Sequence, residues 1–203
     1  MNISYEAVSD QLSRSQRLGF LGDGPVADHV RHASELLEAA GTVGGGTVVD
    51  LGSGGGVPGL VALLDERWER IVLLDRSERR CAFLRTCVAG LEVGGHVEVV
   101  CAEAEVLGRN PEFRGMADAV VSRSFGPAAA TLECASALCR RDGVVVVSDP
   151  PQGREWPTEG LQQLGLVEIT AGSTTQLSLF VRVGELSSQY PRRAGVPARR
   201  PLW

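Results

Sequence analysis

The residues best suited to chemistry in this chain gather in one glycine-dense stretch, TVVDLGSGGGVPG, at positions 47–59. A β-branched apolar run ends there in an acid, Asp50, and a turn with glycines at positions 52, 54, 55, 56 and 59 follows. Glycine has no Cβ and tolerates a positive φ, so backbone N–H groups in such a turn can approach a ligand closely. The spacing predicts a strand, a ligand-binding turn and the start of a helix at 60–64.

Two ligands are compatible with this turn. Residues 54–59 satisfy G-x-G-x-x-G, the turn that holds the pyrophosphate of a dinucleotide, although that pattern alone is weakly specific. Residues 50–56 give D-x-G-x-G-x-G, which resembles the S-adenosylmethionine turn of methyltransferases, where the acid lies near the amino-acid part of the cofactor. Asp75, at the end of the next apolar run, suits the ribose hydroxyls of either cofactor.

Further candidate residues follow the other predicted strands, at the point where each strand ends. They are Arg76 after the second strand, Ala104 and Glu105 after the third, and Arg123, between Ser122 and Ser124, after the fourth. Ligands of open α/β sheets bind beyond the carboxyl ends of the strands, so we expect these residues to border one cleft. His29 and His32 are three positions apart in a predicted helix and therefore share a face.

The elements that position these residues alternate along the chain. Apolar runs predict strands at 47–50, 70–75, 97–101, 117–122 and 143–148, and helical spacing predicts helices at 78–90 and 126–140. Such alternation is typical of a parallel sheet covered on both faces. Residues 166–170 and 176–183 predict a closing antiparallel hairpin instead. The expected fold is a doubly wound α/β sheet of the class I S-adenosylmethionine-dependent methyltransferase (Rossmann-like) type, mostly parallel with a C-terminal antiparallel hairpin.

The sequence divides into three segments that we expect to form a single globular unit. Residues 1–46 form a helical N-terminal extension, with helices at 3–17 and 25–40. Residues 47–186 form the methyltransferase domain, and residues 187–203 form a basic tail rich in Pro and Arg.

Composition excludes several classes of protein. The net charge is −5, which argues against a broad basic surface for nucleic acid, and all 20 basic residues are Arg. Without Lys, the chain has neither a Walker A phosphate loop nor a Schiff-base mechanism. The five cysteines form no C-x-x-C pair, so we expect reduced thiols, a cytoplasmic location and no metal site. No apolar run is long enough for a bilayer and no signal peptide is visible, so no membrane partner is expected.

Several motifs together resemble the family that methylates guanine N7 in small-subunit (16S) ribosomal RNA, also known as glucose-inhibited division protein B. The matching pieces are Val30-Arg-His32, the turn with its Pro58-Gly59 pair, residues 73–84 (LLDRSERRCAFL), Ala104-Glu105, Ser122-Arg123 and residues 190–202 (YPRRAGVPARRPL). Two stretches depart from the family pattern. Residues 18–20 stand where it usually has Asn-Leu-Thr, and residues 148–151 stand where it usually has Lys-Gly.

The resemblance implies that S-adenosylmethionine is the cofactor and that ribosomal RNA or the small ribosomal subunit is the partner. The residues that it assigns to the cofactor are Asp50, Gly52, Ser53, Gly54, Gly56, Asp75, Arg76, Ala104, Glu105 and Arg123.

The implied reaction needs little acid–base chemistry, because guanine N7 has a free lone pair and no proton to remove. Catalysis would then be mostly positioning, which contributes up to ~7–11 kcal/mol in favourable cases. Arg123 is the first catalytic candidate, holding a phosphate or guanine O6, and His32 is expected to line the same cleft. The tail residues expected on RNA phosphates are Arg192, Arg193, Arg199 and Arg200.

Other functions stay open at this level. The acidic net charge and the altered residues 148–151 are compatible with a methyltransferase for a small molecule. A non-catalytic paralogue that binds S-adenosylmethionine is a second alternative, and an NAD-linked oxidoreductase is a more distant one.

Overall fold

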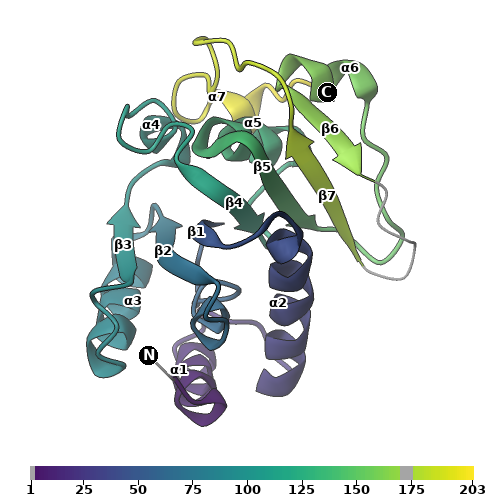
Figure 1. The fold of residues 1–203 in the computed structure, drawn as a ribbon. Coiled ribbons are helices and arrows are strands. Elements are labelled where there is room, and N and C mark those ends of the chain that lie inside the picture. Colours follow the sequence, from purple (N-terminus) through teal and green to yellow (C-terminus); the bar gives the residue numbers. More distant parts are fainter. Residues whose placement is uncertain (1–2, 170–175) are drawn as a thin grey trace.

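A seven-stranded sheet forms the centre of the molecule in the computed structural model, which describes residues 3–169 and 176–203 (Figure 1). The strands are β1 Gly46–Leu51, β2 Trp68–Asp75, β3 Val97–Cys101, β4 Ala117–Ser122, β5 Cys139–Ser148, β6 Leu166–Ile169 and β7 Leu177–Arg182. Their order is β3-β2-β1-β4-β5-β7-β6, and β7 is antiparallel to both β5 and β6. The predicted mostly parallel sheet with a closing antiparallel hairpin is confirmed. The predicted turn at 171–175 and the last residue of the predicted strand at 166–170 lie outside the described residues.

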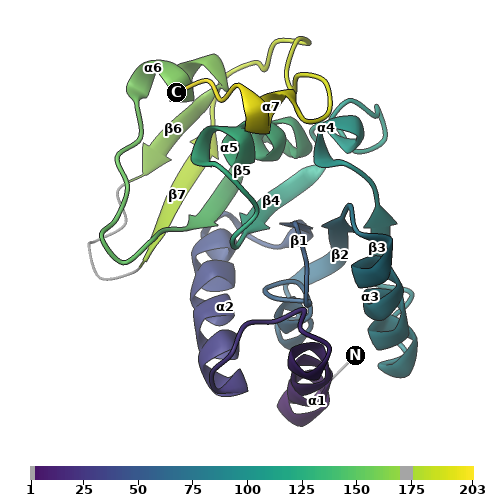
Figure 2. The same cartoon turned by 180° about the vertical axis from the view of Figure 1, so that it is seen from behind.

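Helices cover both faces of this sheet, as the two opposite views show (Figures 1 and 2). The α-helices are α1 Tyr5–Arg17, α2 Val26–Ala40, α3 Glu78–Gly90, α4 Ala104–Leu107, α5 Ala128–Leu138, α6 Thr158–Gln163 and α7 Val196–Arg199, and the 3-10 turns are η1 Gly41–Val43 and η2 Val61–Leu64. One apolar core joins α1, α2 and α3 to the sheet, and a second joins α4, α5 and α6 to its other face.

Strands buried on both faces explain why the sheet could be recognised from apolar runs. In β5, Val144 and Val146 belong to the first core, whereas Val145 and Val147 belong to the second. Because successive side chains of a strand point to opposite faces, a run of valines fills both cores at once.

The segment after the glycine turn differs from the prediction. We expected a helix to start at 60–64, but Val61–Leu64 forms only the short 3-10 turn η2. The backbone becomes extended at Asp65 and β2 begins at Trp68, so the connection leaves no room for a longer helix.

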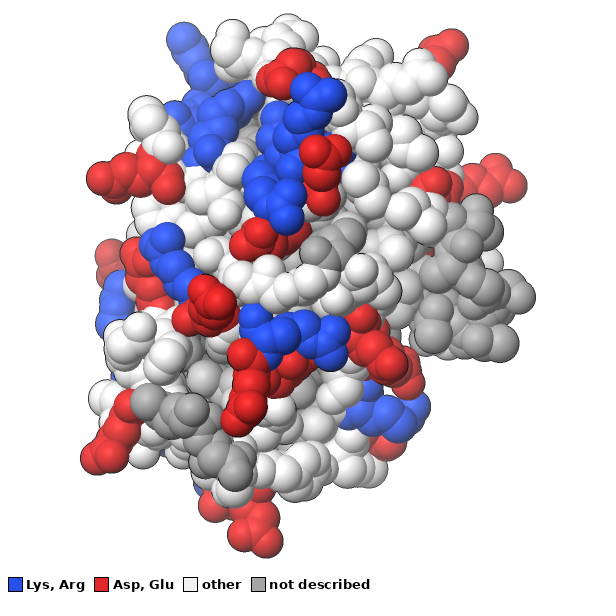
Figure 3. Space-filling view, in the orientation of Figure 1, with Lys and Arg blue, Asp and Glu red and all other residues white. Residues whose placement is uncertain are grey.

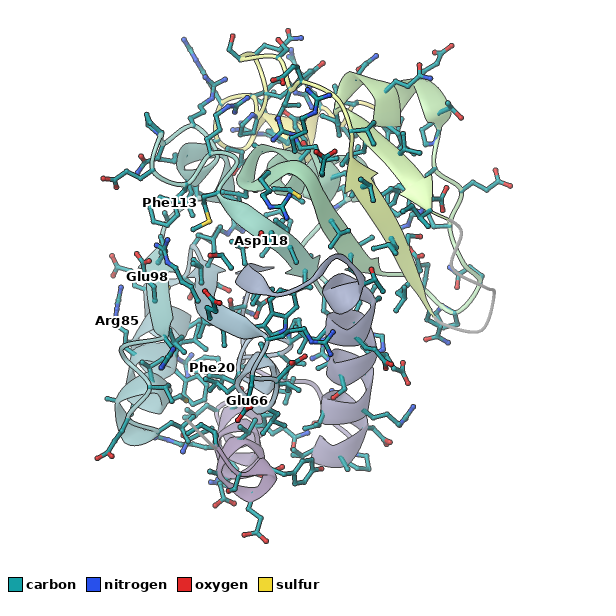
Figure 4. All side chains as sticks on the ribbon, viewed as in Figure 1. Phe20, Glu66, Arg85, Glu98, Phe113 and Asp118 are labelled. Atoms are coloured by element: carbon teal, nitrogen blue, oxygen red, sulfur yellow. The ribbon has the colours of Figure 1, made fainter. Side chains whose placement is uncertain are left out.

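The N-terminal extension packs against the glycine turn rather than standing apart from the sheet. A Cβ on Gly55 would lie 2.7 Å from the carbonyl oxygen of Phe20, and Ser15 is also in contact with that position. Phe20, labelled in Figure 4, follows α1 and packs on Phe83 of α3 with ring centroids 5.5 Å apart. The glycine turn is therefore held from the N-terminal side by the connection between α1 and α2.

Candidate functional site

The glycine turn is held at the carboxyl end of β1 by backbone hydrogen bonds to β2. The N–H groups of Gly52 and Ser53 both donate to the carbonyl of Leu74 at 2.9 Å. Gly52, Gly54 and Gly56 have backbone φ values of 80°, 52° and 98°, which residues other than glycine rarely adopt. A Cβ on Gly52 would also lie 2.7 Å from the Phe125 ring, so this part of the cleft is shaped by the absence of side chains.

Asp50 is a buried carboxyl directly before this turn. Its Oδ2 accepts a hydrogen bond from Gly59 N at 2.8 Å, whereas Oδ1 is buried with no hydrogen-bond partner among the described residues. Burial raises the pKa of Asp50 to about 7, although the Gly59 N–H and nearby Arg123 oppose that rise. A cationic ligand group beside it would favour the ionised carboxylate.

Asp75 at the end of β2 faces the same turn. Its Oδ2 accepts from Gly54 N and its Oδ1 accepts from Ser77 N, both at 2.8 Å. These bonds fix the carboxylate against the turn, and it lines a cleft of about 630 Å³. The cleft is also lined by Gly52, Arg76, Ala104 and Glu105, so the structure brings together predicted residues that follow three different strands.

Two of those residues have additional partners within the protein. The largely exposed guanidinium of Arg76 lies 3.8 Å from the Glu103 carboxylate. Glu105 is buried, and its Oε1 accepts a hydrogen bond from Gly195 N of the C-terminal tail at 2.9 Å. One carboxylate oxygen of Glu105 is therefore used to hold the tail.

A second hollow of about 460 Å³ lies on the other side of the glycine turn. Gly52, Arg80 and Ser124 line both hollows, so the two adjoin. The residues that line the second hollow include His29 and His32 of α2, Arg123 after β4, and Ser148 and Asp149 after β5. An acceptor bound there would lie next to a ligand in the first cleft.

Arg123 is held in position by a histidine. Its Nη1 donates to His29 Nδ1 at 3.2 Å, and His29 Nε2 in turn donates to the Gly22 carbonyl at 3.0 Å. This pair of bonds requires the neutral His29 tautomer with its proton on Nε2. Burial lowers the pKa of Arg123, an effect that the Asp50 carboxylate opposes, and the guanidinium remains charged.

His32, the second predicted catalytic residue, lies beside Arg123 in the same hollow. Burial and then the positive charge of Arg123 lower the pKa of His32, although Glu35 with Oε2 3.8 Å from Nδ1 opposes them. The lowered pKa favours the neutral form of His32. Its neighbour His29 was missed as a site residue, although the three-residue spacing placed both histidines on one face.

The predicted phosphate-contacting arginines of the tail separate into three environments. Arg192 forms an ion pair with the fully buried Glu133, with Nε and Nη2 at 3.0 and 2.6 Å from the two carboxylate oxygens. Arg199 lines the first cleft, and its Nε donates to Gly195 O at 3.1 Å. Arg193 and Arg200 are exposed. The expectation of four phosphate contacts therefore fails for Arg192, because its guanidinium is committed to an internal partner.

Charge is unevenly distributed over the face seen in Figure 3. Arginines gather over the upper part, where Figure 1 has the tail, and basic and acidic side chains are mixed in the lower part. Arg109 and Arg182 lie near enough to Arg114 to lower its pKa, with burial the larger cause. Asp118, labelled in Figure 4, pairs with Arg140 at 2.7 Å.

Within residues 3–169 and 176–203, no group of three or more His, Cys, Asp or Glu could hold a metal ion.

Comparisons with known proteins agree with this geometry. The sequence model of the GidB family, described as rRNA small subunit methyltransferase G, matches residues 27–152. The chain belongs to this family. A protein from Roseiflexus castenholzii named ribosomal RNA small subunit methyltransferase G is 33% identical over 168 residues, 76% of this chain and 70% of that protein. A protein of the same name from Lactobacillus helveticus is 30% identical, over 78% and 70% of the two chains.

Solved structures support the fold. Cofactor-bound Rv0187 from MTB has a TM-score of 0.60 at 17% identity and covers 90% of this chain and 92% of its own. A geranyl diphosphate methyltransferase in complex with SAM has a TM-score of 0.56 at 17% identity, over 76% and 85% of the two chains. The two structures support the fold alone. The family identifies the chain as an S-adenosylmethionine-dependent methyltransferase, which resolves the choice between the two cofactors.

The residues of the first cleft fit this cofactor. Asp75 stands where it can accept from ribose hydroxyls, and the side-chain-free Gly52 leaves room for a ligand against the turn. Asp50 is buried directly before the turn and does not line the cleft, but its Oδ1 has no hydrogen-bond partner among the described residues, which suits a nearby cofactor with an ammonium group and a sulfonium. None of the helices in the described residues is long and apolar enough to cross a bilayer.

Proposed function

We propose that this enzyme transfers a methyl group to guanine N7 of small-subunit ribosomal RNA, in the cytoplasm. The observation that carries the proposal is the position of Arg123, beside Asp50 and His29, in a hollow that adjoins the cofactor cleft. The names of the relatives, all ribosomal RNA small subunit methyltransferase G, support the acceptor.

On the cofactor side, the chain binds and orients. When bound, S-adenosylmethionine supplies an electrophilic methyl group. The glycine turn and Asp75 would hold the ribose side, and Asp50 would face the cationic amino-acid side. Ala104 and Glu105, beyond β3, would border the adenine. Because the two hollows adjoin, the methyl donor and the acceptor would be held next to each other. This positioning would be the main cause of the rate acceleration, since the reaction has no proton to remove.

On the acceptor side, Arg123 would orient the base. Guanine presents O6 and N7 as neighbouring acceptors on one edge. A guanidinium that donates to O6 fixes the base while it leaves the N7 lone pair free. His29 holds the guanidinium in place, and neutral His32 would line the pocket without repelling it.

The exposed tail arginines Arg193 and Arg200 are our candidates for RNA phosphates. They lie outside the internal ion pairs found among the described residues, so their charges remain available to solvent. Binding through phosphates releases counterions and weakens steeply with salt. The double variant Arg193→Ala/Arg200→Ala should therefore bind ribosomal RNA more weakly and with a shallower salt dependence.

The decisive experiment is mass spectrometry of small-subunit ribosomal RNA from cells that lack this gene. We expect the loss of one N7-methylguanine, its return with the wild-type gene and no return with Arg123→Ala. Purified enzyme with naked RNA and with assembled subunits then identifies the form of the acceptor. Unchanged N7-methylguanine in the deletion strain would reject ribosomal RNA as the acceptor and leave a small molecule, or binding without catalysis.

A further inference from the structure

We propose that the C-terminal tail is a wall of the cofactor site, and that Arg199 contacts the adenosine half of S-adenosylmethionine. The sequence predicted that arginines of the tail, residues 187–203, contact RNA phosphates. Instead, Ala194, Gly195, Ala198 and Arg199 line the same cleft as Asp75 and Glu105. The inference rests on the placement of the cofactor proposed above.

Several side chains of the main domain fix the tail in this position. Arg109 Nε donates to Pro191 O at 2.7 Å, and Arg114 Nη1 donates to Tyr190 O at 2.7 Å. The buried Glu133 accepts from both the backbone N and the side chain of Arg192, each with a bond of 2.6 Å. A segment held by so many charge-assisted bonds stays in place when the cleft is empty, so its contribution to binding is pre-organised.

A direct link joins the tail to the residue beyond β3. Glu105 Oε1 accepts from Gly195 N at 2.9 Å, and Gly195 has a φ of +75°. Gly195 therefore lies at the β3 end of the cleft. The glycine turn lies at the β1 end, and Asp75 of β2 lies between them. With the ribose at Asp75, this end takes the adenine ring.

Arg199 suits an uncharged aromatic ligand at this end. Its Nε donates to Gly195 O at 3.1 Å, which folds the side chain back over Gly195, and it has no acidic partner among the described residues. Adenine has no charge, but it offers a π face and ring-nitrogen acceptors. A guanidinium both stacks on such a face and donates in its own plane.

The experiment is calorimetric titration without RNA, using two ligands that share adenosine. S-adenosylhomocysteine contains the amino-acid part, whereas methylthioadenosine lacks it. We expect Arg199→Ala to weaken both by the same factor, about 5- to 20-fold, in keeping with a cation–π contact. Arg199→Lys, which keeps the charge and loses the plane, should recover only part of the loss. Arg85→Ala, at an exposed position of α3, is the control and should stay within about twofold of wild type in both titrations.

Each other outcome overturns a distinct statement. Equal affinity of Arg199→Ala and wild type for both ligands would reject the contact while leaving the cofactor site intact. A loss with S-adenosylhomocysteine that disappears with methylthioadenosine would place Arg199 at the amino-acid end and reject the adenosine contact. Failure of the folded wild-type protein to bind S-adenosylhomocysteine would contradict the proposed site itself. Matching circular dichroism spectra of all variants exclude unfolding as the cause.

Discussion

At the scale of single residues, the site depends on groups whose neighbours set their charge and direction. Arg123 is charged, partly buried and aimed by neutral His29, whereas Asp50 is a buried acid with one unpartnered oxygen. Sequence alone singled out Arg123, His32 and Asp50, because strand ends and helix faces are local patterns. His29 was placed on the same helix face as His32, but its bond to Arg123 joins residues 94 positions apart, so no local pattern indicated that role.

Replacing Arg123 should separate catalysis from cofactor binding. In Arg123→Ala the acceptor loses its orienting donor, and we expect methyl transfer to fall by about 10²- to 10³-fold, as for other oriented donors. The dissociation constant for S-adenosylhomocysteine should stay within about threefold. Single-turnover methylation and calorimetry give the two quantities. Arg31→Ala, an exposed arginine on α2, is the control; an equal loss of rate and affinity in Arg123→Ala would contradict an acceptor role.

Asp50 should make stability depend on pH. Its carboxyl titrates at 3.8 in the unfolded chain and at about 7 when folded, so between these values the folded protein holds the extra proton. The free energy of unfolding therefore falls as pH rises through this window, by up to about 1.4 kcal/mol per unit. Asp50→Asn removes this dependence. In urea unfolding, the free energy of unfolding of Asp50→Asn relative to wild type should therefore rise by about 1–2 kcal/mol between pH 5.5 and 7.

A matched acid with the opposite shift is the control for that measurement. Hydrogen bonds from Thr47 N and Arg140 lower the pKa of Asp118 despite its partial burial, so its contribution is lost only in more acidic solution. The difference between Asp118→Asn and wild type should be constant from pH 5.5 to 7. If Asp50→Asn behaves in the same way, Asp50 does not hold its proton near neutrality.

At the scale of elements, the turn between β1 and η2 is defined by backbone rather than side chains. The sequence predicted its position because glycines, a preceding apolar strand and a following acid are all local signals. It did not predict the length of η2, since that depends on how far the chain must travel to begin β2. The cleft is thus more predictable than the segments that buttress it.

A methyl group at Gly59 should be costly. Its Cβ would lie 2.6 Å from Asp50 Oδ2 and would also strike Leu73, so either the turn or β2 must shift. We expect Gly59→Ala to lower the free energy of unfolding by about 1–3 kcal/mol and to weaken cofactor binding.

The contrasting substitution is Gly90→Ala at the end of α3, where a Cβ meets nothing within 4 Å. Because glycine loses more backbone freedom than alanine on folding, this variant should be more stable by about 0.5–1 kcal/mol. Urea titrations of both variants test the pair. An unchanged free energy of unfolding in Gly59→Ala would contradict the prediction, because it would mean that the turn can accommodate the added methyl group.

At the scale of the whole molecule, side chains from both ends of the chain pack in the two cores that flank the sheet. The N-terminal helices contribute to the first core, and the tail closes the cleft over the other layer. The tail shows why the role of a charged residue is hard to predict from sequence. Its run of Pro and Arg indicated a solvent-exposed RNA contact, yet Arg192 forms an ion pair with the buried Glu133. The one available sign was Glu133 itself, an acid within a helix otherwise rich in Ala and Leu.

Removing the ion pair between Arg192 and Glu133 should lower the free energy of unfolding of the protein. Arg192→Ala leaves the Glu133 carboxylate buried without its cation, and we expect a loss of about 3–5 kcal/mol in the free energy of unfolding. Arg193→Ala, next to it and exposed, should change stability by less than about 0.5 kcal/mol. Thermal and urea unfolding of the two variants provide the comparison. Equal stability would mean that Glu133 finds water or another partner when Arg192 is absent.

During synthesis, Glu133 leaves the ribosome 59 residues ahead of Arg192. At ordinary elongation rates that interval is roughly 3 to 12 s, far longer than a helix needs to form. During this interval, Glu133 of α5 has no Arg192 with which to pair, so its carboxylate cannot be buried as part of that ion pair. The layer that borders the cleft is therefore completed only after all seven strands have been made, and the proposed wall at the adenosine end of the cofactor site is the last part of that site to form.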